Sequence, residues 1–201
     1  MFAISFFSFY ITNAPKYAID KYLSQEVCAC YGFISMPVFV IGLLNGYLYQ
    51  PALVQMAVEW KERRLQHFYK RVKKQCVVIA GLTALCMASG WLCGIPVLSA
   101  AYGTDLSGYQ AELLLLLFGG GMLAYSGYFC VLFTIMCKQR VILYGYAVIA
   151  ALAAGCMGAV TKNFGVIGVV VLFDLLLVML AGIFAWMLPI FSDGRKNCRK
   201  I

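Results

Sequence analysis

The sequence predicts an all-α integral membrane protein built as a bundle of six helices. Of its 201 residues, 63% are hydrophobic and only 12% are charged, and the mean hydropathy is +0.86. This composition carries more apolar surface than one soluble core of this size could bury. Five apolar runs are long enough to cross a hydrocarbon layer of roughly 30 Å, because a helical crossing takes about 20 residues. They lie near 27–50, 76–98, 112–136, 141–161 and 165–190.

The segment near 1–12 is expected to be the first and shortest of the six helices. As a helix it reaches only about 18 Å, so it is a half-helix or a helix whose first turns are missing. It lacks the basic residues and the small-residue cleavage site that flank the apolar region of a signal peptide. Asn13 can accept an N–H hydrogen bond and cap a helix that begins at Pro15. A break or a change of direction is therefore expected at 13–15.

The positions of the basic residues predict which end of the bundle faces the cytoplasm. The net charge is +8, and most basic residues lie in the segment 58–75, the turn 137–140 and the tail 191–201. The other basic residues are Lys16, Lys21 and Lys162. With six crossings, the three basic groups lie on one side and these three lysines on the other, as the positive-inside rule requires. Both termini are therefore expected in the cytoplasm, and the charge does not indicate nucleic-acid binding.

The segment 58–75 is expected to be an amphipathic helix at the cytoplasmic interface. Its apolar residues have the spacing of one helical stripe, and they are Trp60, Leu65, Phe68 and Val72. Anchoring explains such a segment, and a role in docking a lipid headgroup or a partner stays open. The membrane bundle is expected to occupy 1–190, and 191–201 form a basic cytoplasmic tail.

Prolines and glycines mark the positions where we expect the helices to bend or to meet very closely. Pro37 lies inside the second helix, where a missing N–H group bends the backbone. Three successive glycines in the fourth helix lower its propensity by roughly 2–3 kcal/mol, which favours a bend or a very close neighbour. The candidate hinge residues are Pro15, Pro37, Pro51, Gly119, Gly120 and Gly121.

Five polar side chains are candidates for function because of where they fall in the chain. Asn45 and Gln50 lie at the end of an apolar span and contact either a neighbouring helix or a substrate. Asp174 has no basic residue three or four positions away, so it is protonated, paired with another helix, or hydrated. It is a candidate for ion coupling, with a structural acid as the alternative. Lys16 shares a helical face with Asp20 four residues later, which predicts an exposed ion pair or a charged lip of a cavity.

The sequence does not predict an enzyme. The nine cysteines are scattered through the apolar runs without CxxC spacing, and His67, the only histidine, lies in a basic polar loop. No pairing of a nucleophile with a base and no metal-ligand cluster is recognisable. No cofactor and no metal are therefore expected.

Five stretches resemble the polysaccharide-biosynthesis exporters, which include the O-antigen repeat-unit flippases and belong to the multidrug/oligosaccharidyl-lipid/polysaccharide (MOP) superfamily. They are NAPKYAIDKYLS (13–24), YGFISMPVFVIGLLNGYLYQP (31–51), GIPVLSAAYGTDLSGY (94–109), MCKQRVILYGY (136–146) and NFGVIGV (163–169). The first is similar to a recurring N-x-P-[RK]-Y-x-I-[DE]-[KR]-Y-L pattern. The resemblance covers essentially the whole chain, but it matches only the C-terminal lobe of such a two-lobed transporter.

The resemblance implies a transporter of the bacterial inner membrane that moves an isoprenoid-diphosphate-linked oligosaccharide for polysaccharide or lipopolysaccharide synthesis by alternating access. Lys16 and Lys21 would attract the diphosphate, and Asp20 and Asp174 would couple an ion. Hydrogen bonds to the sugars would come from Tyr17, Tyr31, Asn45 and Gln50. The implied partners are membrane lipids, the lipid-linked oligosaccharide, and an N-terminal lobe supplied by another polypeptide or imitated by a second copy.

Two other functions stay open. One is a MATE-like lobe that exchanges small molecules or cations for ions, which would favour acidic cavity residues. The other is a membrane subunit or degenerate fragment that binds a partner without transporting anything.

Overall fold

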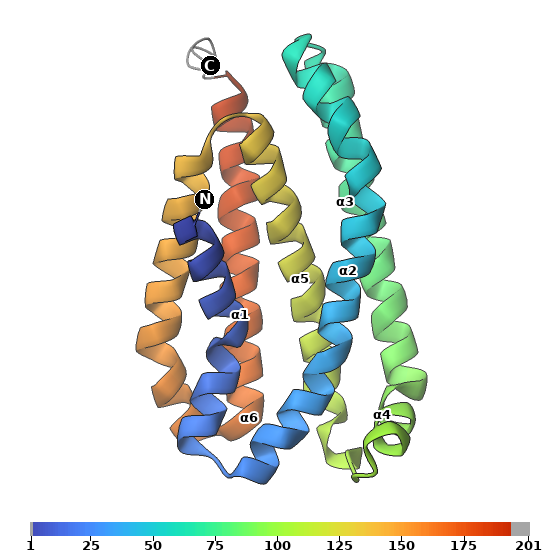
Figure 1. Ribbon diagram of the computed structural model, residues 1–201, viewed down its shortest axis with the longest axis vertical. Coiled ribbons are helices and arrows are strands. Elements are labelled where there is room, and N and C mark those ends of the chain that lie inside the picture. Colours follow the sequence, from blue (N-terminus) through green and yellow to red (C-terminus); the bar gives the residue numbers. More distant parts are fainter. Residues whose placement is uncertain (1, 194–201) are drawn as a thin grey trace.

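The computed structural model describes the backbone of residues 2–193 and the side chains of residues 2–188, and every element in this range is helical. Figure 1 shows the helices standing roughly side by side along one axis, with α5 between the pair α2 and α3 and the group formed by α1 and α6. This is the layered arrangement expected when each apolar helix covers its neighbours.

The first helix, α1 (Phe2–Tyr22), is one continuous helix, so the predicted end near residue 12 and the predicted break at 13–15 are wrong. Pro15 is buried inside the helix. Asn13 does not act as a cap: its Nδ2 donates to the Phe9 carbonyl at 2.9 Å, one turn earlier. Thr12 makes the same bond from Oγ1 to the Ser8 carbonyl. A proline removes only its own N–H donor, and tertiary packing of the buried face keeps the helix intact.

The helices α2 (Gln25–Lys61) and α3 (Leu65–Ser89) form an antiparallel hairpin, and α2 runs through both Pro37 and Pro51. At 37 residues α2 is about 55 Å long, more than a bilayer's hydrocarbon layer requires. Ser24 caps its start by accepting from the Val27 N–H at 3.4 Å. In the turn that joins α2 to α3, Arg63 adopts a left-handed conformation, with φ 63°.

The segment 58–75 is therefore not a single interfacial helix, and that prediction is wrong. It contains the end of α2, the turn and the start of α3. The apolar residues of this segment pack between the two helices of the hairpin. The Trp60 and Phe68 rings lie 5.3 Å apart, and Phe68 and Val72 are buried. Arg71 joins the two helices through Nε, which donates to Glu59 Oε1 at 2.6 Å.

The chain from α3 to α5 contains a wide helical turn. The π-helical segment η1 (Gly90–Gly94) follows α3 and continues into α4 (Ile95–Tyr102), which ends at Gly103 with φ 65°. A short loop with the 3₁₀ turn η2 (Ser107–Tyr109) leads into α5 (Gln110–Ile135). Side chains at i and i+5 replace the usual α-helical neighbours in a π turn, so η1 presents its residues differently from α3.

The helix α6 (Gln139–Asp193) is folded into two antiparallel arms, which correspond to the two helices expected near 141–161 and 165–190 (Figure 1). The fold lies at Gly165, whose φ of 61° and ψ of −148° are accessible mainly to glycine. The arms contact each other through the Tyr146 and Phe184 rings, with centroids 5.9 Å apart. Gly145 permits this approach, because a methyl group there would lie 2.6 Å from the Phe184 ring.

Four helical stretches in the described part of the chain are long and apolar enough to cross a membrane: 25–61, 65–102, 107–135 and 139–188. The last of these is the folded α6. The α2–α3 turn, the α5–α6 turn and the described end of α6 lie at one end of the bundle (Figure 1). The α1–α2 turn, the loop before α5 and the turn between the two arms of α6 lie at the other end.

Candidate functional site

An open groove of about 330 Å³ runs between α1 and α2 near the end of the bundle that holds the α1–α2 turn. Lys16 and Asp20, one helical turn apart on α1, form one wall. Cys28 and Gly32, one turn apart on α2, contribute to the other. This arrangement follows from the i, i+4 spacing on two antiparallel helices, which turns both pairs toward the same space.

The groove leads to a smaller inner cavity of about 110 Å³, and Lys16, Gly32 and Met36 border both. The inner cavity has polar groups on two of its sides and apolar side chains of α5 and α6 at its base. Its lining includes Thr12, Asn13, Tyr31, Ser35, Leu116 and Phe173. The structure therefore brings Lys16, Asp20 and Tyr31, three of the predicted site residues, to one connected space.

The charge and hydrogen-bonding capacity of this space are uneven. Ser35 donates from Oγ to the Gly32 carbonyl at 2.9 Å, so its oxygen is left to accept. Lys16 is exposed at the boundary between the groove and the cavity, and it supplies three N–H donors and a positive charge. Asp20, one turn later on α1, lines the open groove but not the inner cavity. The inner part of the space is thus suited to an anion or to hydroxyl groups.

Asp174 lies next to this space without lining it. Its side chain is 6% exposed, and both carboxylate oxygens lack a hydrogen-bond partner among the described residues. It faces Gly119 of α5, where an added methyl group would overlap Oδ1. Its neighbour Phe173 lines the inner cavity. A buried carboxylate with no partner is costly when ionised, so this position favours a bound proton or cation.

The three successive glycines of α5 explain why three other helices can approach it. Gly119 faces Asp174 of α6, Gly120 lies against Val38 of α2, and Gly121 lies against Thr83 of α3. A methyl group at Gly120 would be 3.1 Å from Val38 Cγ1. The helix is continuous through all three. Close packing is therefore their observed role, and a hinge at these residues stays a prediction.

The remaining predicted site residues lie elsewhere. Asn45 is fully buried on α2, where Nδ2 donates to the Ile41 carbonyl at 3.0 Å and Oδ1 has no partner among the described residues. Gln50 is exposed, and it lies about 30 Å from Tyr31 along the same helix. Tyr17 and Lys21 are exposed and do not line the groove or the inner cavity. None of these four residues lines the groove or the inner cavity that Lys16 borders.

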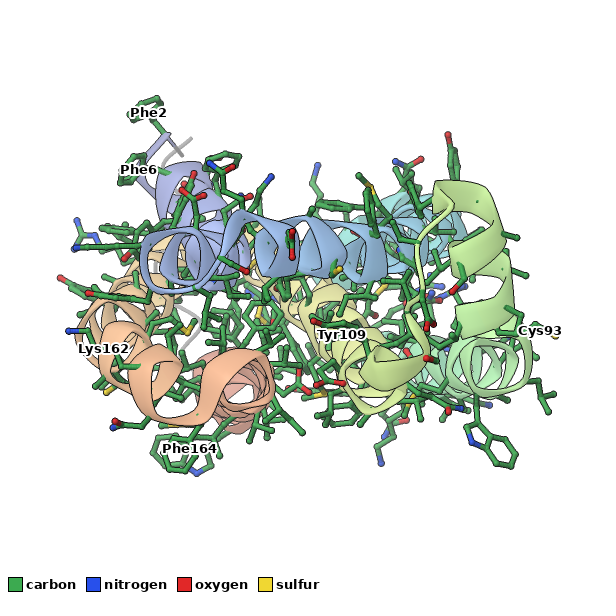
Figure 2. All side chains as sticks on the ribbon, turned by 90° about the horizontal axis from the view of Figure 1, so that it is seen from below. Phe2, Phe6, Cys93, Tyr109, Lys162 and Phe164 are labelled. Carbon is green, nitrogen blue, oxygen red and sulfur yellow. The ribbon has the colours of Figure 1, made fainter. Side chains whose placement is uncertain are left out.

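Lys21 instead belongs to a small cluster at the end of the bundle. Its Nζ lies 5.4 Å from the centre of the Tyr22 ring, and Lys162 Nζ lies 4.9 Å from the same ring. Figure 2, seen from below, shows Lys162 at the side of the bundle formed by α6. Both lysines are exposed cations resting on an aromatic face.

Three lining residues were missed from the sequence: Thr12 and Ser35, which line the inner cavity, and Gly32, which borders both spaces. A helical spacing could have found them. Thr12 precedes Lys16 by one turn, and Ser35 follows Cys28 by two turns, so each continues a stripe that also holds a recognisable polar or small residue.

No protein-family model, no curated protein and no solved structure matches this chain. Within residues 2–193 every element is helical, and four of the described helices are long and apolar enough to span a membrane, which indicates an all-α membrane protein.

Proposed function

We propose that this chain is one lobe of a membrane transporter that moves a lipid-linked oligosaccharide, with the diphosphate of the substrate held beside α1. The observation that supports this most is that Lys16 borders both the groove between α1 and α2 and the inner cavity, whose lining includes the polar side chains of Thr12, Asn13 and Ser35. A diphosphate carries negative charge and several acceptor oxygens, and a lysine donates to such groups as a point charge. The sugars would occupy the open part of the groove.

Transport would proceed by alternating access. The charged headgroup and the sugars would pass along the polar groove while the lipid tail stays in the bilayer, and the lobe would rock against a second lobe. That second lobe would be another polypeptide or a second copy of this chain. The bundle would lie in a bacterial inner membrane with six crossings and both termini in the cytoplasm. The gathering of the basic turns at one end of the bundle supports this orientation.

Asp174 would couple the motion to an ion. Its side chain is 6% exposed and its carboxylate has no hydrogen-bond partner among the described residues, and the preceding residue in the chain, Phe173, lines the inner cavity. Exchange of a proton or Na⁺ at Asp174 would therefore need a change in the packing of α5, α6 and α2. Asp20, nearer the mouth, would be the first acid that an entering cation meets.

A translocation assay in proteoliposomes tests this function. The chain, with and without a candidate second lobe, would be reconstituted with a fluorescent isoprenoid-diphosphate-linked disaccharide, and the fraction reaching the far leaflet would be measured over time. Lys16→Ala should lower the rate at least tenfold, whereas Lys162→Ala, which removes an exposed cation outside the groove, should leave it within twofold. Equal rates for the two variants would contradict the proposal.

The buried acid favours one alternative, a lobe that exchanges small cations for protons or Na⁺. Asp174 and Asp20 are the groups that such a transporter would use. The same proteoliposomes would be loaded with a fluorescent organic cation. Efflux driven by an imposed ion gradient and abolished by Asp174→Asn, without any movement of the lipid-linked disaccharide, would establish this alternative.

A further inference from the structure

A second cavity, of about 410 Å³, lies on the side of α2 that faces away from α1. Its walls come from α2, from α3 and η1, from α4 and from α5. They are almost entirely apolar, and they include Pro37, Val40, Ile41, Val97, Leu113 and Leu117. Val40 and Val97 are more than half exposed at its rim. Because its rim is apolar and exposed, we expect this cavity to open toward the hydrocarbon layer of a membrane.

The π-helical segment η1 shapes the inner wall of this cavity. Gly90 and Gly94 lie directly against Leu117 and Leu113 of α5, and a methyl group at either glycine would overlap the leucine. The wide turn and the two glycines together hold η1 close to α5 while α4 continues along the side. Such π turns occur frequently at functional sites, because they reposition a few side chains without ending the helix.

The apolar cavity meets the groove that holds Lys16. Met36 borders this cavity, the open groove and the inner cavity, and its side chain is 51% exposed. The groove that contains Lys16 and the apolar cavity therefore adjoin at the flexible side chain of Met36. Methionine adapts to irregular ligands because it is unbranched and polarizable.

We propose that this cavity binds the isoprenoid units nearest the diphosphate of the lipid-linked substrate. The inference rests on the proposed function and adds the site for the tail. A ligand with its diphosphate at Lys16 must lead its chain into the bilayer, and the apolar cavity beside Met36 offers that chain a path. Burying the chain there removes apolar surface from the polar groove, which is favourable.

Two native cysteines make the cavity accessible to chemical labelling. Cys86 and Cys93 both line it, and Cys93 is exposed. Figure 2 shows Cys93 at the margin formed by η1 and α4, on the opposite side of the bundle from Lys162. Cys156 on α6 is also exposed and lies outside the cavity, so it serves as an internal control.

The test measures the labelling rate of each thiol with a lipid-soluble maleimide, by peptide mass spectrometry of the whole chain in lipid nanodiscs. Farnesyl diphosphate should slow labelling of Cys93 at least fivefold and leave Cys156 unchanged, and inorganic diphosphate alone should protect neither. Unprotected Cys93 would overturn the inference. Equal protection by added phosphatidylglycerol at the same concentration would also overturn it, because the cavity would then hold any lipid chain.

Two variants test whether the protection of Cys93 depends on the cavity. Val97→Phe fills the rim and should abolish protection of Cys93, whereas Val171→Phe, at a half-exposed position of α6, should not. Both positions are exposed, so neither change disturbs a packed core, and melting temperatures check this. Protection that survives Val97→Phe would argue against the cavity as the tail site.

The outcomes separate the inference from the proposed function. Translocation that depends on Lys16 while Cys93 stays unprotected would reject the tail site and keep the function. Protection of Cys93 without any translocation, with or without a second lobe, would keep the site and reject the function.

Discussion

At the scale of single residues, Gly119 on α5 lies directly against the carboxyl group of Asp174 on α6. The carboxylate occupies the space that any larger residue at 119 would fill, and no other described group bonds to it. The glycine is therefore required by the acid, and the two positions should respond to substitution as a pair.

Gly119→Ala should lower the stability by about 1–3 kcal/mol, because the added methyl group overlaps Asp174 Oδ1 and forces the side chain to move. Gly127→Ala is the matched control, since nothing lies within 4 Å of a methyl group there and the helix gains up to about 1 kcal/mol in propensity. Thermal unfolding in detergent measures both. The double variant Gly119→Ala with Asp174→Ala should recover part of the loss, and additive losses would contradict the pairing.

Asp105, in the loop before α5, should give a measurable pH dependence. The Ser107 N–H donates to Asp105 Oδ1 at 3.0 Å, and this bond together with one from the Ser107 hydroxyl holds the pKa of the carboxyl below its ordinary value. A lowered pKa in the folded state stabilises the fold above the unfolded pKa of about 3.9, and this contribution is lost as the pH falls through the folded value.

Asp105→Asn keeps an oxygen that can accept the same bond but removes the charge. The melting temperature of the wild type should therefore fall more steeply than that of Asp105→Asn when the pH is lowered below about 4. Parallel curves for the two proteins would show that the loop bond does not depend on the charge.

At the scale of elements, the α2–α3 hairpin is held at its tip by one partly buried ion pair. Arg71→Ala should destabilise the protein by about 1–2 kcal/mol, because it leaves the largely buried Glu59 carboxylate without its partner. Arg64→Ala is the control, since the Arg64–Glu62 pair is exposed on both sides and should contribute less than about 0.5 kcal/mol. Chemical unfolding monitored by tryptophan fluorescence compares the two. Equal effects would contradict the assigned role of the Glu59 pair.

The elements also show where sequence reasoning succeeds and where it stops. Apolar runs locate the helices well, because membrane-spanning length dominates the pattern. Local signals at Asn13 and Pro15 suggested a break, but burial of one face of α1 outweighs a single lost N–H donor. The stripe in 58–75 was recognised correctly, yet periodicity cannot reveal that a turn at Arg63 folds the stripe onto itself.

The residues of the candidate site also divide into those that the sequence placed together correctly and those that it did not. Lys16 and Asp20 were predicted on one face because they lie on one helix. Asn45 and Gln50 were expected to bind the sugars together with Tyr31, as the family resemblance implies, but their separation along α2 keeps them apart. The closeness of Asp174 to Gly119 depends on how α5 and α6 pack, which no local pattern encodes.

At the scale of the whole molecule, the two ends of the bundle should lie on opposite sides of the membrane. Cys137 is exposed in the α5–α6 turn, at the end that carries the basic turns. In right-side-out vesicles a membrane-impermeant maleimide should leave Cys137 unlabelled until the vesicles are opened, whereas a cysteine introduced by Asn163→Cys should react at once. The reverse pattern would invert the proposed orientation.

The central claim is that the groove between α1 and α2 recognises a diphosphate through the charge of Lys16. The direct measurement is the equilibrium affinity of the purified protein for an isoprenoid diphosphate, compared among the wild type, Lys16→Ala and Lys16→Arg. Lys16→Ala should weaken binding about tenfold, which corresponds to about 1.4 kcal/mol, and Lys16→Arg should keep the affinity within about threefold. An affinity unchanged in Lys16→Ala would contradict the account.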